Sequence, residues 1–99
     1  MTSVQIDAWE VLGLLGDPVR RRIVALLARE ELCTCHLVAE LGLKQPLVSH
    51  HLKALRGAGV VQGSPCGRYT YYRLRPEAVR AAAGMLHGLV VDEPGRRPC

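Results

Sequence analysis

The chain has 99 residues, of which 48% are hydrophobic, so it is long enough for one small domain and too short for two. Lys and Arg outnumber Asp and Glu by 13 to 9, and the net charge of +4 with a pI near 9.2 favours an acidic partner such as a nucleic acid. No apolar run approaches the roughly 20 residues of a membrane span and no secretory signal core is present, so we expect a cytoplasmic protein without a membrane partner.

Three helices are predicted in the first half of the chain. Residues 4–15 carry an apolar side chain at about every third position, which is typical of a helix with one buried side. Asp17 and Pro18 indicate a second helix start, because Asp caps free N–H groups and Pro suits the first turn, and this helix is expected to reach residue 30. A third, shorter helix is predicted for residues 32–41.

A fourth helix is predicted for residues 46–57, with apolar and polar side chains on separate faces. Its polar face is basic, and Glu77 is the only carboxylate between residues 45 and 91. Such a face is typical of a helix that enters the major groove of DNA, and its position directly after the third helix predicts a helix-turn-helix. The stripe expected to pack inward comprises Val48, Leu52 and Leu55.

A β-hairpin is predicted next. Residues 60–61 and 69–74 are rich in β-branched and aromatic side chains, and residues 63–67 between them are Gly- and Pro-containing turn material. A hairpin that follows a recognition helix is the wing of a winged helix-turn-helix.

The last helix is predicted for residues 77–91, and together with the first helix it is expected to join two copies of the chain. Residues 92–99 show no periodicity and are expected to form a flexible tail. The sequence therefore predicts a mainly α fold with a β-hairpin wing, a winged helix-turn-helix of order α-α-α-α-β-β-α. This domain would occupy residues 1–91 and act as a homodimer.

Six side chains are candidates for contacts with double-stranded operator DNA. Those near the start of the fourth helix would face base edges, whereas those further along it and in the wing would hold phosphates. His51 lies between apolar neighbours one turn away on the helix and is expected to pack inward rather than to touch DNA. The expected base contacts are Gln45, Ser49 and His50, and the expected phosphate contacts are Lys53, Arg56 and Arg68.

Cys33 and Cys35 stand two positions apart at the start of the predicted third helix. In a reducing compartment the four cysteines are expected to be thiols, and a C-x-C pair indicates metal or redox chemistry. Thiolates select soft or borderline ions over Mg²⁺ or Ca²⁺. Residues i and i+2 of a regular helix point about 200° apart, so we expect either that an ion shared by both sulfurs unwinds the first turn or that this turn is already frayed.

The segments ELCTCHL at residues 31–37 and QPLVSHHLKALR at residues 45–56 together strongly resemble the ArsR/SmtB family of metal-sensing winged-helix repressors, over about residues 15–74. The resemblance implies a homodimer that binds operator DNA in its metal-free state and releases it when an ion binds. It also implies that Cys33 and Cys35 are ligands of the inducing ion. That ion would be As(III) or Sb(III), with Cd(II), Pb(II) or Zn(II) as alternatives.

The resemblance does not supply a third ligand. Val38 stands where the best-known arsenite sensors carry a further cysteine, and no cysteine precedes Cys33, as one does in the cadmium and lead sensors. We expect Cys99 to reach the site on the flexible tail, and Cys66 in the wing is the other candidate. His36, an external thiol and water remain open.

Two alternative functions have a basis in the cysteines. The same fold would serve as a thiol redox switch if Cys33 and Cys35 responded to oxidation. A small thiol-dependent enzyme, such as an arsenate reductase with Cys33 or Cys66 as nucleophile, is a more remote alternative. Such an enzyme needs a C-x-x-C pair or a Gly-rich loop that holds phosphate, and the sequence has neither. We therefore expect neither an enzyme nor a small organic substrate.

Overall fold

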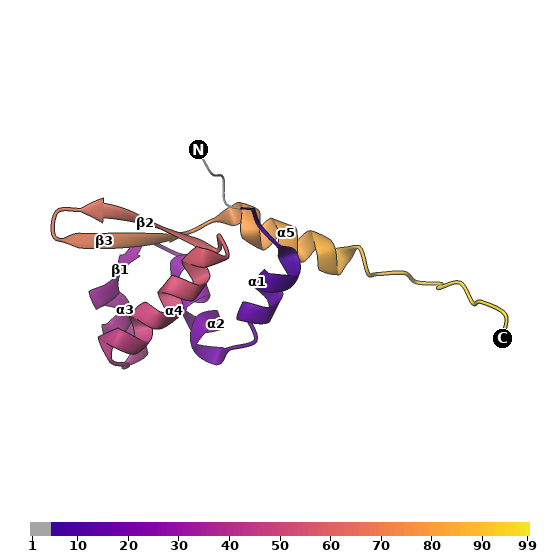
Figure 1. Cartoon of the computed structure of the whole chain (residues 1–99), viewed down its shortest axis with the longest axis horizontal. Helices are drawn as coiled ribbons and strands as arrows, with labels where there is room; N and C mark the ends of the chain where they lie inside the picture. The colour runs from indigo at the N-terminus through magenta and orange to yellow at the C-terminus, as the bar shows by residue number, and fades with distance from the viewer. Residues whose placement is uncertain (1–4) are drawn as a thin grey trace.

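The computed structural model describes residues 5–99, which form five helices and one three-stranded sheet (Figure 1). The helices are α1 (Ala8–Leu14), α2 (Pro18–Leu27), α3 (Thr34–Leu41), α4 (Gln45–Gly57) and α5 (Pro76–His87). The strands are β1 (Leu32–Cys33), β2 (Val61–Cys66) and β3 (Tyr69–Leu74). Helices α2, α3 and α4 lie below the hairpin, whereas α1 lies beside α5, which runs away from the wing and leads to the C-terminal residues (Figure 1).

Side-chain caps define where the first two helices begin. Oδ1 of Asp7 accepts a hydrogen bond from the Trp9 backbone N–H at 3.0 Å, at the start of α1. Oδ1 of Asp17 accepts from the backbone N–H of Val19 at 2.8 Å, and Pro18 follows as the first residue of α2. The predicted helix start at Asp17 is therefore confirmed.

The predicted third helix is wrong in its first two residues. Leu32 and Cys33 form strand β1, which pairs antiparallel with β3, so the helix begins at Thr34. The pairing partner lies about forty residues further along the chain, and local periodicity carries no signal for such a contact. Strand order in the sheet is β1-β3-β2, which makes β3 the central strand.

Other predicted boundaries also differ from the structure. Helix α2 ends at Leu27 rather than at residue 30, because the chain turns there to bring Leu32 into the sheet. Helix α5 ends at His87 rather than at residue 91, and the apolar side chains beyond it are exposed. The predicted start of the first helix at Val4 lies outside the described residues.

The hairpin turn is tighter than predicted. Strands β2 and β3 pair without interruption up to Cys66 opposite Tyr69, so Gly67 and Arg68 alone form the turn and residues 63–66 belong to the strand. Gly67 has a φ of 60°, and no non-glycine residue of the described chain has a positive φ, the pattern of a type II′ turn. Pro65 is tolerated because β2 lies at the edge of the sheet.

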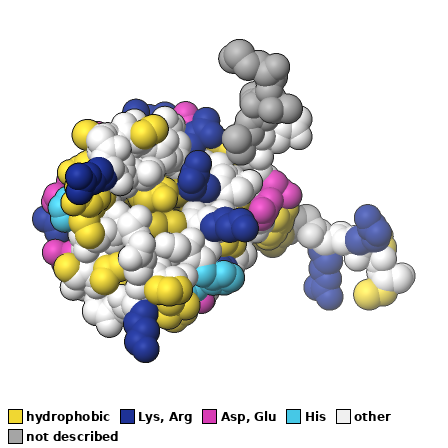
Figure 2. Space-filling view, turned by 60° about the vertical axis from the view of Figure 1, so that its left-hand side comes forward, with side chains coloured by type: hydrophobic (Ala, Val, Ile, Leu, Met, Phe, Trp, Pro, Cys, Tyr) yellow, Lys and Arg dark blue, Asp and Glu magenta, His cyan; other side chains and the backbone are white. Residues whose placement is uncertain are grey.

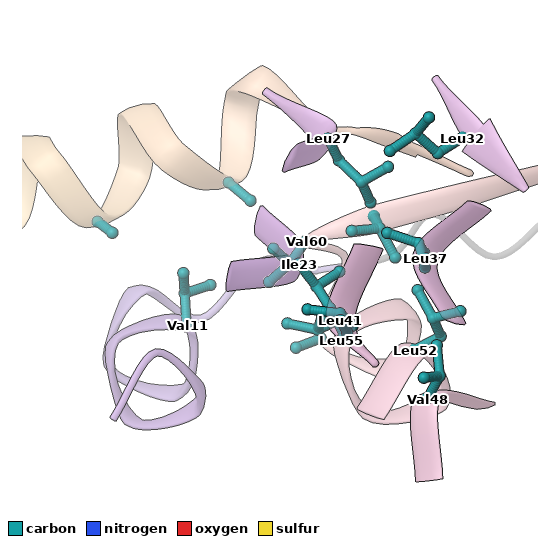
Figure 3. Close-up of a cluster of buried hydrophobic side chains, with 14 residues drawn as sticks. Val11, Ile23, Leu27, Leu32, Leu37, Leu41, Val48, Leu52, Leu55 and Val60 are labelled. Carbon is teal, nitrogen blue, oxygen red and sulfur yellow. The ribbon is translucent and has the colours of Figure 1, made fainter. Parts of the chain in front are cut away.

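One apolar core holds the helices and the sheet together (Figure 3). The expected inward stripe of α4 is confirmed, since Val48, Leu52 and Leu55 are each at most 1% exposed. Val11 of α1 lies apart from this centre, on the side facing α5 (Figure 3). The predicted winged helix-turn-helix is therefore confirmed, with β1 as an additional strand. None of the described helices has both the length and the apolar character needed to cross a membrane.

Candidate nucleic-acid interface and thiol site

Helix α4 presents a polar face beside the wing, while its apolar stripe is buried in the core. On the face of the molecule shown in Figure 2, Lys and Arg side chains are spread around apolar surface, and the fewer acidic side chains lie toward the edges. This distribution suits a polyanion. All six residues predicted to contact DNA are exposed on α4 or in the wing: Gln45, Ser49, His50, Lys53, Arg56 and Arg68.

His51 anchors α4 to α2, as expected for a side chain that packs inward. It is 6% exposed, and its Nδ1 accepts a hydrogen bond from Nε of Arg20 at 3.1 Å. Burial lowers the pKa of His51 below its ordinary value of 6.5, and the nearby carboxylate of Asp17 opposes this only in part. The hydrogen bond from Arg20 requires a neutral His51, because only the neutral imidazole has a free lone pair on Nδ1.

The wing packs closely on the recognition helix. A Cβ added at Gly63 would lie 3.0 Å from Cγ2 of Thr70 and 3.3 Å from Cε1 of Tyr72, so a side chain there would crowd the neighbouring strand. The same Cβ would lie 3.6 Å from Cζ of Arg56, an ordinary contact distance that places the end of the Arg56 side chain beside the hairpin. A hollow of about 330 Å³ separates the two elements and is lined by Ser49, Lys53, Arg56 and Tyr72. Three of the residues predicted to contact DNA therefore line one depression between the helix and the wing.

Cys33 and Cys35 lie side by side because Cys33 is not part of the helix. Cys33 occupies the N-cap of α3 in an extended conformation, with φ −85° and ψ 168°, and the two Cα atoms are 5.4 Å apart. Of the two expected alternatives, unwinding of a helical turn is therefore not required, because Cys33 precedes the first turn of α3. The structure joins the two sulfurs in a disulfide, whereas the sequence predicted thiols. Only Cys66 and Cys99 are free thiols among the described residues.

His36 completes a group of three possible metal ligands. Within the described residues, one ligand atom from each of Cys33, Cys35 and His36 lies within 4.8 Å of the others. Nδ1 of His36 accepts a hydrogen bond from the Cys33 backbone N–H at 3.1 Å and lies 3.2 Å from the Cys33 Sγ. Two sulfurs and an imidazole fit a soft or borderline ion and not Mg²⁺ or Ca²⁺.

Cys66 and Cys99, the two candidates for a further ligand, lie outside this group. Cys66 is exposed at the end of β2, next to the hairpin turn. Cys99 is exposed at the C-terminus, which lies at the opposite end of the molecule from β1 and α3 (Figure 1). The single chain thus does not bring either of them to Cys33 and Cys35.

A pocket of about 360 Å³ connects the cysteine pair with the predicted DNA contacts. The sequence did not predict that the cysteine pair and the DNA contacts share a pocket, nor that Tyr69 and Tyr72 of β3 line it between them. The alternation of aromatic and polar side chains in β3 signals a strand, but only the pairing of β1 with β3 places that strand next to Cys33. The walls of the pocket include Cys33, Thr34, Cys35, Gln45, Arg68 and Tyr69.

Comparison with known proteins agrees with this architecture. Residues 17–62 match the family described as "Bacterial regulatory protein, arsR family". The chain is 36% identical over 88 residues to the arsenical resistance operon repressor of Escherichia coli K12, covering 88% of this chain and 71% of that protein. A crystal structure titled "Possible transcriptional regulator for arsenical resistance" superposes with a TM-score of 0.76 at 31% identity, covering 84% of this chain and 86% of that one.

A relative from Pseudomonas putida, the arsenic resistance transcriptional regulator ArsR1, is 44% identical over 81 residues. The match covers 81% of this chain but 63% of the relative, so the chain spans less than two thirds of that protein's length. The relatives named here are regulators of transcription, and none is named as an enzyme. On the strength of the fold, the exposed recognition helix and these matches, the chain belongs to the ArsR family of bacterial regulatory proteins.

Proposed function

We propose that this protein is a metalloid-responsive transcriptional repressor that binds operator DNA as a homodimer. As(III) or Sb(III) would release it by binding the thiolates of Cys33 and Cys35. The observation that carries the proposal is the placement of these cysteines on and beside β1, whose partner strand β3 belongs to the wing. The arsenical-resistance names of the relatives support the choice of ion.

DNA binding is supported by the exposed basic face of α4 and the neighbouring wing. Gln45, Ser49 and His50 would read base edges in the major groove, and Lys53, Arg56 and Arg68 would hold phosphates. A homodimer would present two such helices to half-sites about 34 Å apart along the operator.

Dimerisation is supported by apolar side chains that the single chain leaves exposed on α1 and along α5 and its extension. Trp9 is 65% exposed and Leu86 is 48% exposed, although both belong to amphipathic helices. Helices α1 and α5 pack on each other, and large exposed apolar side chains gathered on neighbouring helices are typical of an interaction site. The exposed members are Trp9, Val79, Leu86, Leu89, Val90 and Val91.

Release of DNA would follow from movement of β1. An ion held by Cys33 and Cys35 pulls on backbone that is hydrogen-bonded to β3, and β3 carries the wing. The same ion displaces the N-terminus of α3, which packs on α4. Reversing operator occupancy from 99:1 bound to 99:1 free needs about 5.5 kcal/mol of differential binding, which metal–thiolate bonds can supply.

If the chain itself supplies a third ligand, we propose Cys99 as the first candidate and Cys66 as the second. Cys99 ends a segment, residues 92–99, that we propose to be a tail outside the domain of residues 1–91, and it would reach a site on its own or on the partner subunit. His36 is the better third ligand for Zn(II), Cd(II) or Pb(II), because imidazole suits borderline ions. These ions remain alternatives to As(III) and Sb(III).

A thiol redox switch is a second candidate function, favoured by the Cys33–Cys35 disulfide. A peroxide would oxidise the two thiols to the disulfide and be reduced to water. The disulfide ties Cys35 of α3 to the N-cap residue, so oxidation acts on the same junction of β1 and α3 as an ion would.

The test is a fluorescence-anisotropy titration of the reduced protein on its upstream promoter DNA, with As(III), Sb(III), Cd(II), Pb(II), Zn(II) and hydrogen peroxide added in turn. Cys33→Ser is the informative variant, because serine keeps the capping role at this N-cap position and removes the thiolate. Cys66→Ser is the matched control, and Cys99→Ser tests the third ligand. We expect As(III) to release the wild type but not Cys33→Ser. Release by peroxide alone, or an unimpaired response of Cys33→Ser, would reject the metalloid site.

A further inference from the structure

The pocket beside the cysteine pair has a chemical character of its own. Cys33 and Cys35 line it together with Arg68 of the hairpin turn. In the described part of the chain the one ion pair is Arg75 with Glu77, so the charge of Arg68 has no carboxylate partner there. Once the Cys33–Cys35 disulfide is reduced, the pocket of about 360 Å³ is lined by two soft donors and one cation.

Two protein sulfurs leave a trivalent thiophilic ion one donor short. His36 is not on the wall of the pocket, and its Nδ1 already accepts a hydrogen bond from the Cys33 backbone N–H. Cys66 and Cys99 lie outside the ligand group formed within the described residues. Both cysteines line the pocket and Cys35 is exposed, so a donor from solution has room to enter beside them.

We propose that this pocket binds a small anionic thiol, such as a thiol carboxylate, together with the ion. The sulfur of the thiol supplies the third bond and its carboxylate pairs with Arg68. This inference rests on the proposed function of Cys33 and Cys35. In the binding step, As(OH)₃ exchanges three As–O bonds for three As–S bonds, two to the protein and one to the thiol. The three thiol protons leave in three molecules of water, and no electrons are transferred.

The disulfide is compatible with the same ligand. Two further molecules of the thiol reduce the Cys33–Cys35 disulfide and leave joined as their own disulfide, so the electrons balance. The bound carboxylate would occupy Arg68 and the thiol would cover Gln45, which lines the same pocket. Because both residues belong to the proposed DNA face, the co-ligand would compete with a DNA phosphate at the point where the ion binds.

Native mass spectrometry of the reduced chain tests the inference without DNA. As(III) is titrated with a phosphine reductant and one of three additions: no thiol, neutral 2-mercaptoethanol, or anionic 3-mercaptopropionate. We expect a complex of one arsenic and one mercaptopropionate per chain. It should form at an As(III) concentration about fivefold lower than the complex with mercaptoethanol, because the carboxylate adds one favourable ion pair with Arg68. Arg68→Gln should abolish the difference between the two thiols, and Arg73→Gln, in the same hairpin but outside the pocket, should retain it.

The outcomes separate this inference from the proposed function. Equal complex formation with the two thiols, or loss of the difference in Arg73→Gln as well, overturns the role of Arg68. Arsenic bound without added thiol in the wild type, but not in Cys99→Ser, makes Cys99 the third ligand and overturns the co-ligand while the repressor proposal stands. Failure of the wild type to bind arsenic under any of the three conditions overturns the proposed function itself.

Discussion

Cys33 lies directly opposite Tyr71 in the antiparallel pairing of β1 with β3, and the Tyr71 ring lies 6.0 Å from the ring of His36. Backbone pairing and ring packing thus join the thiol site to the central strand of the wing. A short strand of two residues cannot move independently of the strand on which it pairs. We therefore expect the contact between these two positions to carry the response from the ion to the DNA face.

Replacing Tyr71 by alanine should weaken this coupling and leave the ligands in place. The Tyr71→Ala variant keeps the backbone pairing to Cys33 but loses the ring beside His36. We expect the ratio of As(III) affinities measured without and with operator DNA to fall about fivefold, about 1 kcal/mol of coupling. The ratio is obtained from thiolate absorbance titrations, with Arg73→Ala as the control on the same strand. Equal ratios in both variants would assign the coupling to α3 instead.

Mild acid should destabilise the fold through His51. Because burial lowers its pKa in the folded chain, the unfolded chain binds more protons below pH 6.5, and stability falls as the pH drops from 6.5 through the folded pKa. The loss should not exceed about 1.4 kcal/mol per pH unit, the limit for one proton. Protonation also removes the Nδ1 acceptor of the Arg20 hydrogen bond.

Urea denaturation between pH 5 and 8 measures this effect. We expect His51→Gln to flatten the dependence, since its amide oxygen still accepts from Arg20 but does not titrate in this range. The exposed neighbour His50, replaced by Gln, serves as the control and should keep the wild-type slope. The Asp17 carboxyl, whose pKa is held below 3.8 mainly by the Arg20 backbone N–H, titrates below this window. An unchanged slope in His51→Gln would place the titrating group elsewhere.

The proposed phosphate and base contacts should differ in their salt and sequence dependence. Lys53→Gln removes one phosphate contact, so binding should weaken similarly on every operator variant and the salt slope should fall by about 1. Gln45→Ala should cost about 1–3 kcal/mol on the operator and little on DNA mutated at the contacted base pair. Anisotropy titrations at several salt concentrations distinguish the two patterns. A uniform loss for Gln45→Ala would make it a positioning contact only.

The hairpin turn should be sensitive to a side chain at Gly67. Its φ of 60° is unfavourable for L-residues, so Gly67→Ala should destabilise the fold by about 1 kcal/mol although nothing lies within 4 Å of the added Cβ. Gly57→Ala is the matched control, because Gly57 ends α4 with a normal φ and open space around it, and alanine there should be neutral or stabilising by up to about 1 kcal/mol. Thermal unfolding of both variants checks the sign.

The sequence by itself determined the parts of this fold that depend on near neighbours. Asp17 followed by Pro18 specifies a helix start through bonds that span two or three residues. The spacing of Val48, Leu52 and Leu55 predicted which face of α4 is buried, and with it which polar side chains remain exposed. The inward packing of His51 followed from the same periodicity.

The tertiary structure alone decided how the thiol site relates to the DNA face. Cys33 is extended rather than helical because it pairs with Tyr71, and this places its sulfur against Cys35 without unwinding a turn. The same pairing brings Arg68, which directly precedes β3, to the pocket that Cys33 and Cys35 line, and the packing of α4 on α3 places Gln45 there. Hydrogen bonds between strands form where packing of the core brings two backbone segments together. Local periodicity in the sequence does not predict which segments, far apart in the chain, will pair.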